Sequence, residues 1–188
     1  MNPGMQRATR RLDTGDPAEI AAYETAFYRG FERATHNRLV RWLWDWDCEA
    51  GRLRTRIGYD DQRIWVLPGE RGLVTAGIAV NVRLKQLQAS AFGFGVPQEL
   101  REEAEAGRVC EILTLFAVGD GGLGWKLPLW REVFADLRAE GFTHALATTA
   151  PKMLPLYRFI RARILGQAEI EGETRFFLQF DLSRIRRN

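Results

Sequence analysis

The segment best suited to chemistry is a glycine-rich stretch at 119–124, which reads Gly-Asp-Gly-Gly-Leu-Gly. It follows an apolar run at 109–118 that predicts a buried strand, and it precedes a segment at 126–140 with apolar residues on one helical face. A glycine loop between a strand and a helix directs backbone N–H groups at one point, where the helix dipole favours an anion. The spacing therefore predicts a phosphate-binding loop, and an ordinary turn without a ligand is the alternative.

A carboxylate interrupts the apolar run at Glu111, within the sequence Val-Cys-Glu-Ile at 109–112. An isolated buried charge is too unfavourable to be placed in a strand without a partner. One interpretation places Glu111 in an active cleft, where burial raises its pKa and it takes a proton from an acceptor ammonium. The other interpretation places it on the wetter face of the strand, paired with an arginine.

The first half of the chain must supply helices and an antiparallel pair. Asp16 followed by Pro17 predicts the N-cap and first position of a helix. A Pro-Gly-containing segment at 68–72 lies between two apolar, β-branched runs and predicts a hairpin loop. We expect a short strand at 6–12, a helix with an apolar stripe up to 31, a second helical stretch at 39–46, and hairpin strands at 64–67 and 73–82.

The second half predicts a strand and helix alternation that ends in a hairpin. Residues 83–107 lack a sustained period and indicate an excursion from the sheet, with an acidic helical piece at 98–106 and a potential role in a substrate pocket. Alternation at 175–182, with Glu171-Gly172 near the turn, indicates the closing hairpin. After the glycine loop we expect a helix at 126–140, a strand at 144–149, a helix at 153–164 and this hairpin.

The composition suits a single domain spanning 1–188, with 46% hydrophobic and 27% charged residues. A net charge of +3 is too small to indicate a nucleic-acid-binding protein. No stretch has the pattern of a signal peptide or approaches the roughly 20 apolar residues that span a bilayer, so we expect a cytoplasmic protein without an integral membrane segment. Cys48 and Cys110 lack metal-ligand spacing with His36 and His144, so neither a disulfide nor a metal site is expected.

The order of these elements resembles the GNAT superfamily of N-acetyltransferases over nearly the whole chain. The phosphate loop of that superfamily reads Gln or Arg, two residues, Gly, one residue, then Gly or Ala. Gly122-Leu123-Gly124 matches its end, whereas Gly119 replaces the basic or amide residue. The resemblance implies an α+β fold with a mixed, mostly antiparallel sheet flanked by helices and with splayed central strands.

The same resemblance implies a pantetheine-bound acyl donor, either acyl-CoA or an acyl-phosphopantetheine. The implied donor-binding residues are Leu115, Phe116, Ala117, Val118, Gly119, Gly121, Gly122, Gly124, Trp125 and Lys126. Tyr157, in a Leu-Tyr context before the closing strands, resembles a tyrosine that lies near the donor sulfur in relatives. A phenol there can protonate the thiolate leaving group as an amine attacks the thioester. The alternative for Tyr157 is simple packing, with the hydroxyl at the surface.

A narrower resemblance is to acyl-homoserine-lactone synthases and long-chain N-acyl amino acid synthases, which use acyl carrier protein donors. Their middle region contains a strand ending in Arg-Leu, a long excursion with Phe and Pro, and a strand beginning Glu-x-Ser-Arg. Residues 82–84, 92–97 and 111–114 follow that layout, with Leu-Thr in place of Ser-Arg. The resemblance implies that Arg83 pairs with an acceptor carboxylate, and a surface arginine is the alternative. Trp44 or Trp46 resembles the N-terminal tryptophan of these enzymes.

We therefore expect an N-acyltransferase that moves an acyl group from a pantetheine thioester to a small amine, with amino acids among the acceptors. An acetyl-CoA-dependent acetyltransferase for a small amine or peptide is the second hypothesis, and a noncatalytic acyl-thioester-binding module is the third. Basic side chains on the two expected flanking helices favour an acidic carrier protein over free CoA as the donor, with ordinary solvated helix faces as the alternative. These side chains are Lys126, Arg131, Arg158, Arg161 and Arg163.

Overall fold

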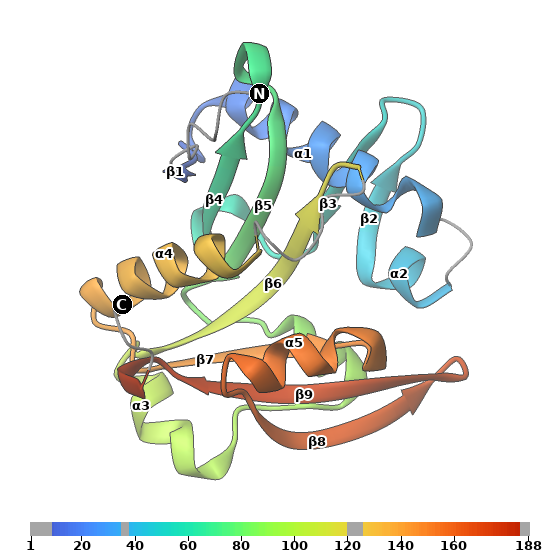
Figure 1. Ribbon diagram of the computed structural model, residues 1–188. Helices are drawn as coiled ribbons and strands as arrows, with labels where there is room; N and C mark the ends of the chain where they lie inside the picture. The colour runs from blue at the N-terminus through green and yellow to red at the C-terminus, as the bar shows by residue number, and fades with distance from the viewer. Residues whose placement is uncertain (1–8, 35–37, 120–125, 185–188) are drawn as a thin grey trace.

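The computed structural model describes residues 9–34, 38–119 and 126–184. Within these ranges, seven strands form one sheet in the order β1-β4-β5-β6-β7-β9-β8, and β2 pairs with β3 in a separate hairpin. Neighbouring strands of the large sheet are antiparallel, except that β6 and β7 are parallel. The predicted α+β arrangement with a mixed, mostly antiparallel sheet is therefore confirmed (Figure 1).

Apart from the β2–β3 hairpin, which the sequence did not predict, the elements follow the expected order along the chain. The strands of the large sheet are β1 (Arg10–Arg11), β4 (Gln62–Pro68), β5 (Val74–Asn81), β6 (Val109–Ala117), β7 (His144–Thr149), β8 (Arg163–Ile170) and β9 (Glu173–Asp181). The separate hairpin consists of β2 (Trp44–Asp47) and β3 (Arg52–Thr55). The helices are α1 (Pro17–Phe31), α2 (Arg38–Leu43), α3 (Arg101–Glu105), α4 (Lys126–Ala139) and α5 (Leu154–Phe159).

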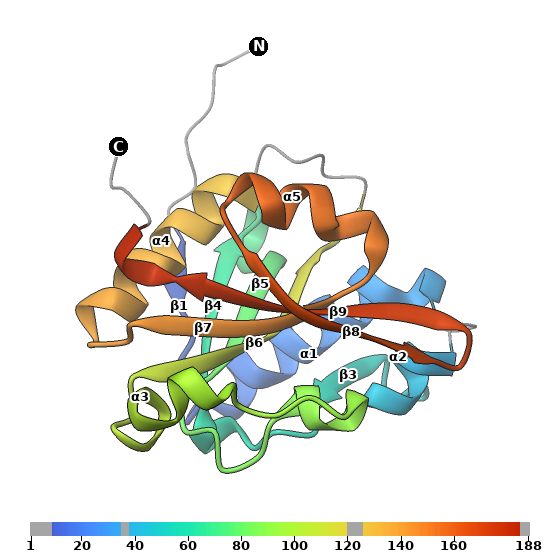
Figure 2. The same ribbon diagram turned by 90° about the horizontal axis from the view of Figure 1, so that it is seen from below.

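Different segments cover the two faces of the sheet (Figure 2). On one face, α4 and α5 bury a cluster that includes Trp130, Phe134 and Phe180. On the other face, α1 and the β2–β3 hairpin cover β4, β5 and β6. The excursion at 83–107 covers that second face over β7 and β9. The central strands are therefore accessible to ligands only where these covers leave a gap.

The first helix is fixed by its cap and by a close approach to the sheet. Asp16 Oδ1 accepts a hydrogen bond from the Ala18 N–H at 2.8 Å, as the sequence predicted for an N-cap. A Cβ added at Gly30 would lie 3.1 Å from the Phe116 ring and 3.2 Å from the Ala117 carbonyl oxygen. The last turn of α1 therefore lies directly against β6 because residue 30 has no side chain.

The prediction of one helical stretch at 39–46 is wrong in its second half. The helix α2 ends at Leu43, and Trp44–Asp47 forms the strand β2 opposite β3. The Trp-Asp-Trp-Asp sequence alternates apolar and polar residues with the period of a strand. Trp44 turns inward, where its ring packs 4.9 Å from Phe27 and 4.8 Å from Phe31 between centroids. The alternation at 44–47 was not recognised because the apolar residues of the preceding segment are spaced as in a helix.

The prediction of a helix at 153–164 is also too long. The helix α5 ends at Phe159, where the Ala162 N–H reaches back to the Tyr157 carbonyl at 2.9 Å and Arg161 adopts a positive φ of 65°. Arg163 then begins β8 and lies 3.4 Å from Glu99 in an ion pair. Arg163 therefore belongs to a strand, not to a helix that flanks the donor entrance. The predicted strand at 6–12 is described only from residue 9, and there it covers Arg10–Arg11.

Candidate active site

The two central strands separate partway along their length. Parallel pairing joins 109–112 of β6 to 144–147 of β7, and both strands continue beyond it without pairing to each other. The predicted splay of the central strands is confirmed. Past the splay, one edge of β6 has backbone N–H and C=O groups at alternate residues of 113–117 that no strand within the described residues binds. A ligand can pair with this edge as a further strand would.

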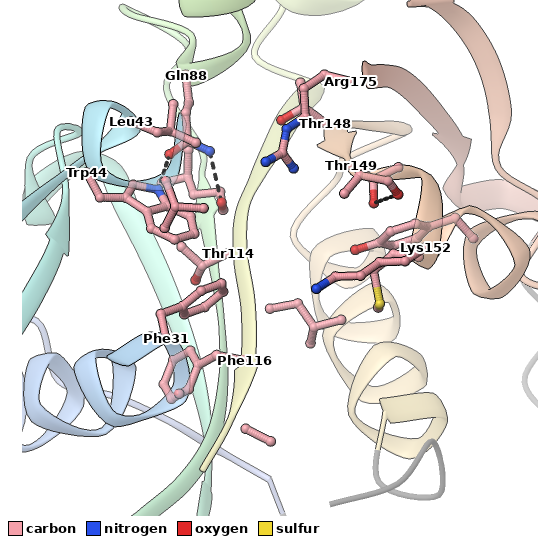
Figure 3. Close-up of a pocket in the computed structure, with 18 of the residues that line it drawn as sticks. Phe31, Leu43, Trp44, Gln88, Thr114, Phe116, Thr148, Thr149, Lys152 and Arg175 are labelled. Carbon is pink, nitrogen blue, oxygen red and sulfur yellow. Dashed lines mark hydrogen bonds between the residues drawn. The ribbon is translucent and has the colours of Figure 1, made fainter. Parts of the chain in front are cut away.

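A cavity of about 300 Å³ occupies the gap between the separated strands (Figure 3). One wall consists of β6 with side chains from α1, α2 and β2, among them Phe31, Leu43 and Trp44. The opposite wall consists of the end of β7, the start of α5, and Arg175 from β9. The cavity therefore joins an apolar, aromatic wall to a wall with several polar side chains.

Gln88 fixes the excursion to the β6 wall. Its Oε1 accepts a hydrogen bond from Trp44 Nε1 at 2.8 Å, and its Nε2 donates to the Leu113 carbonyl at 2.9 Å. A bulge in the pairing of β5 with β6 leaves Leu113 without a partner on β5, because Ala79 pairs with Thr114 and Val80 pairs with Ile112. Gln88 therefore binds a carbonyl that the sheet leaves free, and it orients the indole of Trp44.

Glu111 is buried beneath this wall and does not line the cavity. Its Oε1 accepts the Ala89 N–H at 2.7 Å, and its Oε2 accepts the Gln88 N–H at 2.9 Å and Asn81 Nδ2 at 3.4 Å. Burial raises the pKa of this carboxyl to about 7, while the hydrogen bonds from Ala89, Gln88 and Asn81 oppose the shift. The partners of Glu111 are thus two backbone amides of the excursion and the Asn81 side chain of β5, which neither interpretation of the sequence anticipated.

Tyr157 lines the opposite wall. Its ring lies in the cluster under α4 and α5, 5.8 Å from Trp130 and 5.9 Å from Phe180 between centroids. Burial raises the pKa of its phenol to about 12, and a hydrogen bond with the Thr149 side chain opposes that shift. The hydroxyl is therefore not at the surface, and it remains protonated at neutral pH.

The predicted donor-binding residues fall into three groups. Leu115, Phe116, Ala117 and Gly119 line the cavity, and Gly119 has a positive φ of 81°. Val118 does not line it, because its N–H turns to the Thr75 carbonyl at 2.8 Å. Gly121, Gly122, Gly124 and Trp125 lie outside the described residues, and Lys126 is described only as the first residue of α4.

Arg83 lies away from the cavity. Its side chain is exposed, and its Nε lies 3.7 Å from Asp61 Oδ1, which also binds Lys85 at 3.0 Å. Its predicted role in binding an acceptor carboxylate stays a prediction, and the residues around it are those of a surface ion-pair network.

The polar cavity residues missed in the sequence include Gln88, Thr148, Thr149, Lys152 and Arg175. Gln88 lies in a segment without periodicity, so nothing in its sequence context marks it as buried. Thr148 lies in a mostly apolar strand whose sequence does not show which side chains face a cavity. Arg175 could have been noticed, because it lies two residues before Phe177. It therefore projects from the same face of the predicted strand as that large apolar side chain.

The described residues contain neither a group of three or more His, Cys, Asp or Glu side chains able to hold a metal ion nor a helix long and apolar enough to cross a bilayer. Cys48 is exposed and Cys110 is buried, and both are free thiols.

The sequence matches no protein-family model and no curated protein. Solved structures do match. BjaI, a CoA-dependent acyl-homoserine lactone synthase solved with SAM and isopentyl-CoA, superposes with a TM-score of 0.67 at 17% identity over 95% of this chain and 83% of its own. FeeM, an N-acyl amino acid synthase from uncultured soil microbes, gives a TM-score of 0.62 at 12% identity over 95% and 97% of the two chains.

An N-acetyltransferase from Staphylococcus aureus Mu50 gives a TM-score of 0.58 at 12% identity, covering 93% of this chain and 98% of its own. These identities are too low to transfer an activity, but the superpositions extend over nearly the full length of each chain. Together with the splayed β6 and β7, they show that the chain has the GNAT-like fold of these acyltransferases.

Proposed function

We propose that this protein is an N-acyltransferase that moves an acyl group from a pantetheine thioester to an amine by direct attack. The observation that carries the proposal is the free edge of β6, which faces a cavity that also contains the hydroxyl-bearing residue Tyr157. A pantetheine arm carries two amide groups, and an unpaired strand edge offers N–H and C=O groups at matching intervals. The similar fold of BjaI and FeeM supports the same assignment.

Tyr157 is assigned the role of general acid. In the reaction, the amine nitrogen forms a bond to the thioester carbon and loses a proton, and the carbon–sulfur bond breaks. The departing thiolate takes a proton from Tyr157, whose phenolate then regains the proton released by the nitrogen, so the net transfer is one proton from nitrogen to sulfur. A phenol with its pKa raised to about 12 holds that proton at neutral pH and can deliver it to a thiolate within reach. Positioning of the two substrates in one cavity supplies the remainder of the acceleration.

The prediction that Glu111 takes the proton from the amine stays a prediction. The contacts of Glu111 support a positioning role, because both its oxygens accept N–H groups of residues 88 and 89 and hold Gln88 at the cavity wall. In that role Glu111 acts through Gln88 rather than on a substrate.

The test of the proposed function is a product assay. Purified protein is incubated with matched acetyl, octanoyl and myristoyl thioesters of CoA and of acyl carrier protein, together with a panel of amines and amino acids. Mass spectrometry is expected to detect an N-acyl product together with release of the free thiol. Thioester binding without any amide product would instead support the noncatalytic acyl-thioester-binding module.

The donor is assigned to a carrier protein on the basis of the exposed arginines near the cavity. Arg158 lies on α5, Arg161 lies two residues beyond the end of that helix, and Arg131 lies on α4. Charge reversal of Arg158 and Arg161 to Glu should slow association with acyl carrier protein, most strongly at low ionic strength, because exposed charges act over a Debye length. The same assay with acyl-CoA is the control. Equal or better kcat/KM with CoA, without a salt-dependent loss in the variant, would reject the carrier protein.

A further inference from the structure

Arg175 is a largely buried cation in the wall of the cavity. Its side chain is 14% exposed, and its guanidinium extends beside Thr148 toward the gap next to β6 (Figure 3). Nη2 lies 3.3 Å from Glu173 Oε2, whereas Nε is buried and has no hydrogen-bond partner among the described residues. No carboxylate is found among the described side chains that line the cavity. Arg175 therefore lines the cavity with a guanidinium that is incompletely paired in the described part of the chain, since its Nε has no acceptor and its Nη2 binds Glu173.

A guanidinium without its acceptors is unfavourable in a buried position. Leaving a buried N–H unpaired is unfavourable because its desolvation is not compensated, and the effect is larger for a charged group. Burial lowers the pKa of Arg175, yet the group remains charged at neutral pH because an arginine titrates far above it. A ligand carboxylate would supply the missing acceptors, since its two oxygens match the planar fork of N–H donors.

The position of Arg175 indicates which substrate carries that carboxylate. Tyr157 belongs to the cluster under α4 and α5, whereas Phe177 belongs to the cluster under the excursion and stacks on Phe94 with centroids 4.8 Å apart. Side chains two residues apart on a strand share a face, so Arg175 leaves β9 on the face of Phe177. The phenol and the guanidinium therefore reach the cavity from opposite faces of the sheet.

We propose that Arg175 binds the carboxylate of the acceptor, so that the acceptor is a carboxylate-bearing amine of the amino acid class. This inference rests on the proposed function, in which the donor thioester enters on the side of Tyr157 and the amine reaches it from the opposite face. Arg175 is then the residue that selects amino acids over simple amines.

The experiment uses pairs of product analogues that differ only in the carboxylate. N-acyl-phenylalanine and N-acyl-phenethylamine, each with acetyl, octanoyl and myristoyl chains, are titrated into the full-length protein by calorimetry. The wild-type protein should bind at least one carboxylate-bearing member about tenfold or more tightly than its partner, the range of a charge-assisted hydrogen bond. In Arg175→Gln this preference should fall below about threefold, and Arg175→Lys should retain part of it.

The control is Arg163→Gln, which removes an exposed arginine from the neighbouring strand β8 and should leave the preference unchanged. Equal binding of both members by the wild-type protein, absence of binding by every pair, or an intact preference in a folded Arg175→Gln variant would each overturn the assignment. If Arg175→Gln does not fold, the preference for the carboxylate-bearing analogue is compared between the wild-type protein and Arg175→Lys, and this comparison still tests the assignment.

Binding does not require turnover, so the two proposals fail separately. Carboxylate-dependent binding without acyl transfer from any donor would support the Arg175 site and reject the acyltransferase. Acyl transfer to amines with and without a carboxylate at equal kcat/KM, in both the wild-type protein and Arg175→Gln, would reject the Arg175 site alone.

Discussion

The two walls of the cavity differ in how their polar groups are satisfied. On the β6 wall, Gln88 bonds to Trp44 and to the Leu113 carbonyl, and the Thr114 hydroxyl lies 3.3 Å from the Tyr23 hydroxyl. On the opposite wall, the Nε of Arg175 is buried without a hydrogen-bond partner in the described part of the chain. These side chains of the first wall hydrogen-bond within the protein, and its binding capacity lies in the backbone edge of β6, whereas the second wall contains a guanidinium with a buried N–H that has no partner.

This difference assigns a structural role to the side chains of the β6 wall and a ligand-binding role to the opposite wall. A wall whose buried polar side chains are paired, such as Gln88 and Trp44, holds one geometry, because movement of these side chains would break several hydrogen bonds at once. A wall with unpaired donors loses stability that a ligand can restore. We therefore expect changes on the β6 wall to act mainly on stability, and changes on the opposite wall to act mainly on binding and turnover.

The largest effect is expected for Tyr157→Phe. Removing the hydroxyl should lower kcat by about 10 to 1000-fold with little change in donor affinity, because general acid catalysis contributes in that range. Steady-state and single-turnover kinetics with a fixed donor measure both quantities. Tyr28→Phe is the matched control, since Tyr28 packs on Trp46 and lies outside the cavity. An unaltered single-turnover rate for Tyr157→Phe would remove the catalytic role from this wall.

A smaller effect, on stability rather than catalysis, is expected for Gln88→Ala. The change leaves Trp44 Nε1 and the Leu113 carbonyl without their partners in a buried site, so the free energy of unfolding should fall by about 2 to 4 kcal/mol. Urea denaturation measures the loss, and the exposed Gln98→Ala should change stability by less than about 0.5 kcal/mol. A stable Gln88→Ala protein with lowered kcat would reverse the assigned roles of the two walls.

The smallest effect is a pH dependence that Glu111 gives to the supporting wall. Its pKa is raised from an ordinary value of 4.5 to about 7, so the folded state binds the proton more tightly than the unfolded chain does. Its contribution to stability is therefore fully present below pH 4.5 and is lost as the pH rises through about 7.

Unfolding free energies of the wild-type protein and Glu111→Gln, measured between about pH 5 and pH 8, test this sign. The wild-type protein should lose on the order of 1 to 3 kcal/mol relative to the variant across that interval. A gain of the wild-type protein relative to the variant with rising pH would mean that the N–H donors of residues 88 and 89 outweigh burial.

The elements that could be predicted from sequence are those that depend on local patterns. The N-cap at Asp16, the β4–β5 hairpin and the strand beginning at Val109 depend on local patterns, and they are confirmed. The extent of α2 and of α5 was predicted wrongly, because the helix ends there depend on the packing of Trp44 and on a positive φ at Arg161.

The sequence predicted part of the cavity lining, along β6 and at Tyr157 of α5. Leu115, Phe116 and Ala117 line the cavity because β6 and β7 separate beside them. Gln88 and Arg175 come from segments far from β6 in sequence, and no local pattern determines which side chains meet across a gap. The β6 wall was thus partly visible in the sequence, whereas the cation of the opposite wall was not.

The short stretch of pairing between β6 and β7 has a consequence for how ligand binding affects stability. Pairing at 109–112 and 144–147 is the stretch where the strand group β1-β4-β5-β6 joins the group β7-β9-β8. A donor bound along the free edge of β6 and against α5 would contact both strand groups and hold them together. Binding should therefore stabilise the protein by RT ln(1 + L/Kd), where L is the free donor concentration, so that a rise in melting temperature reports occupancy of the cavity even when no acceptor has been identified.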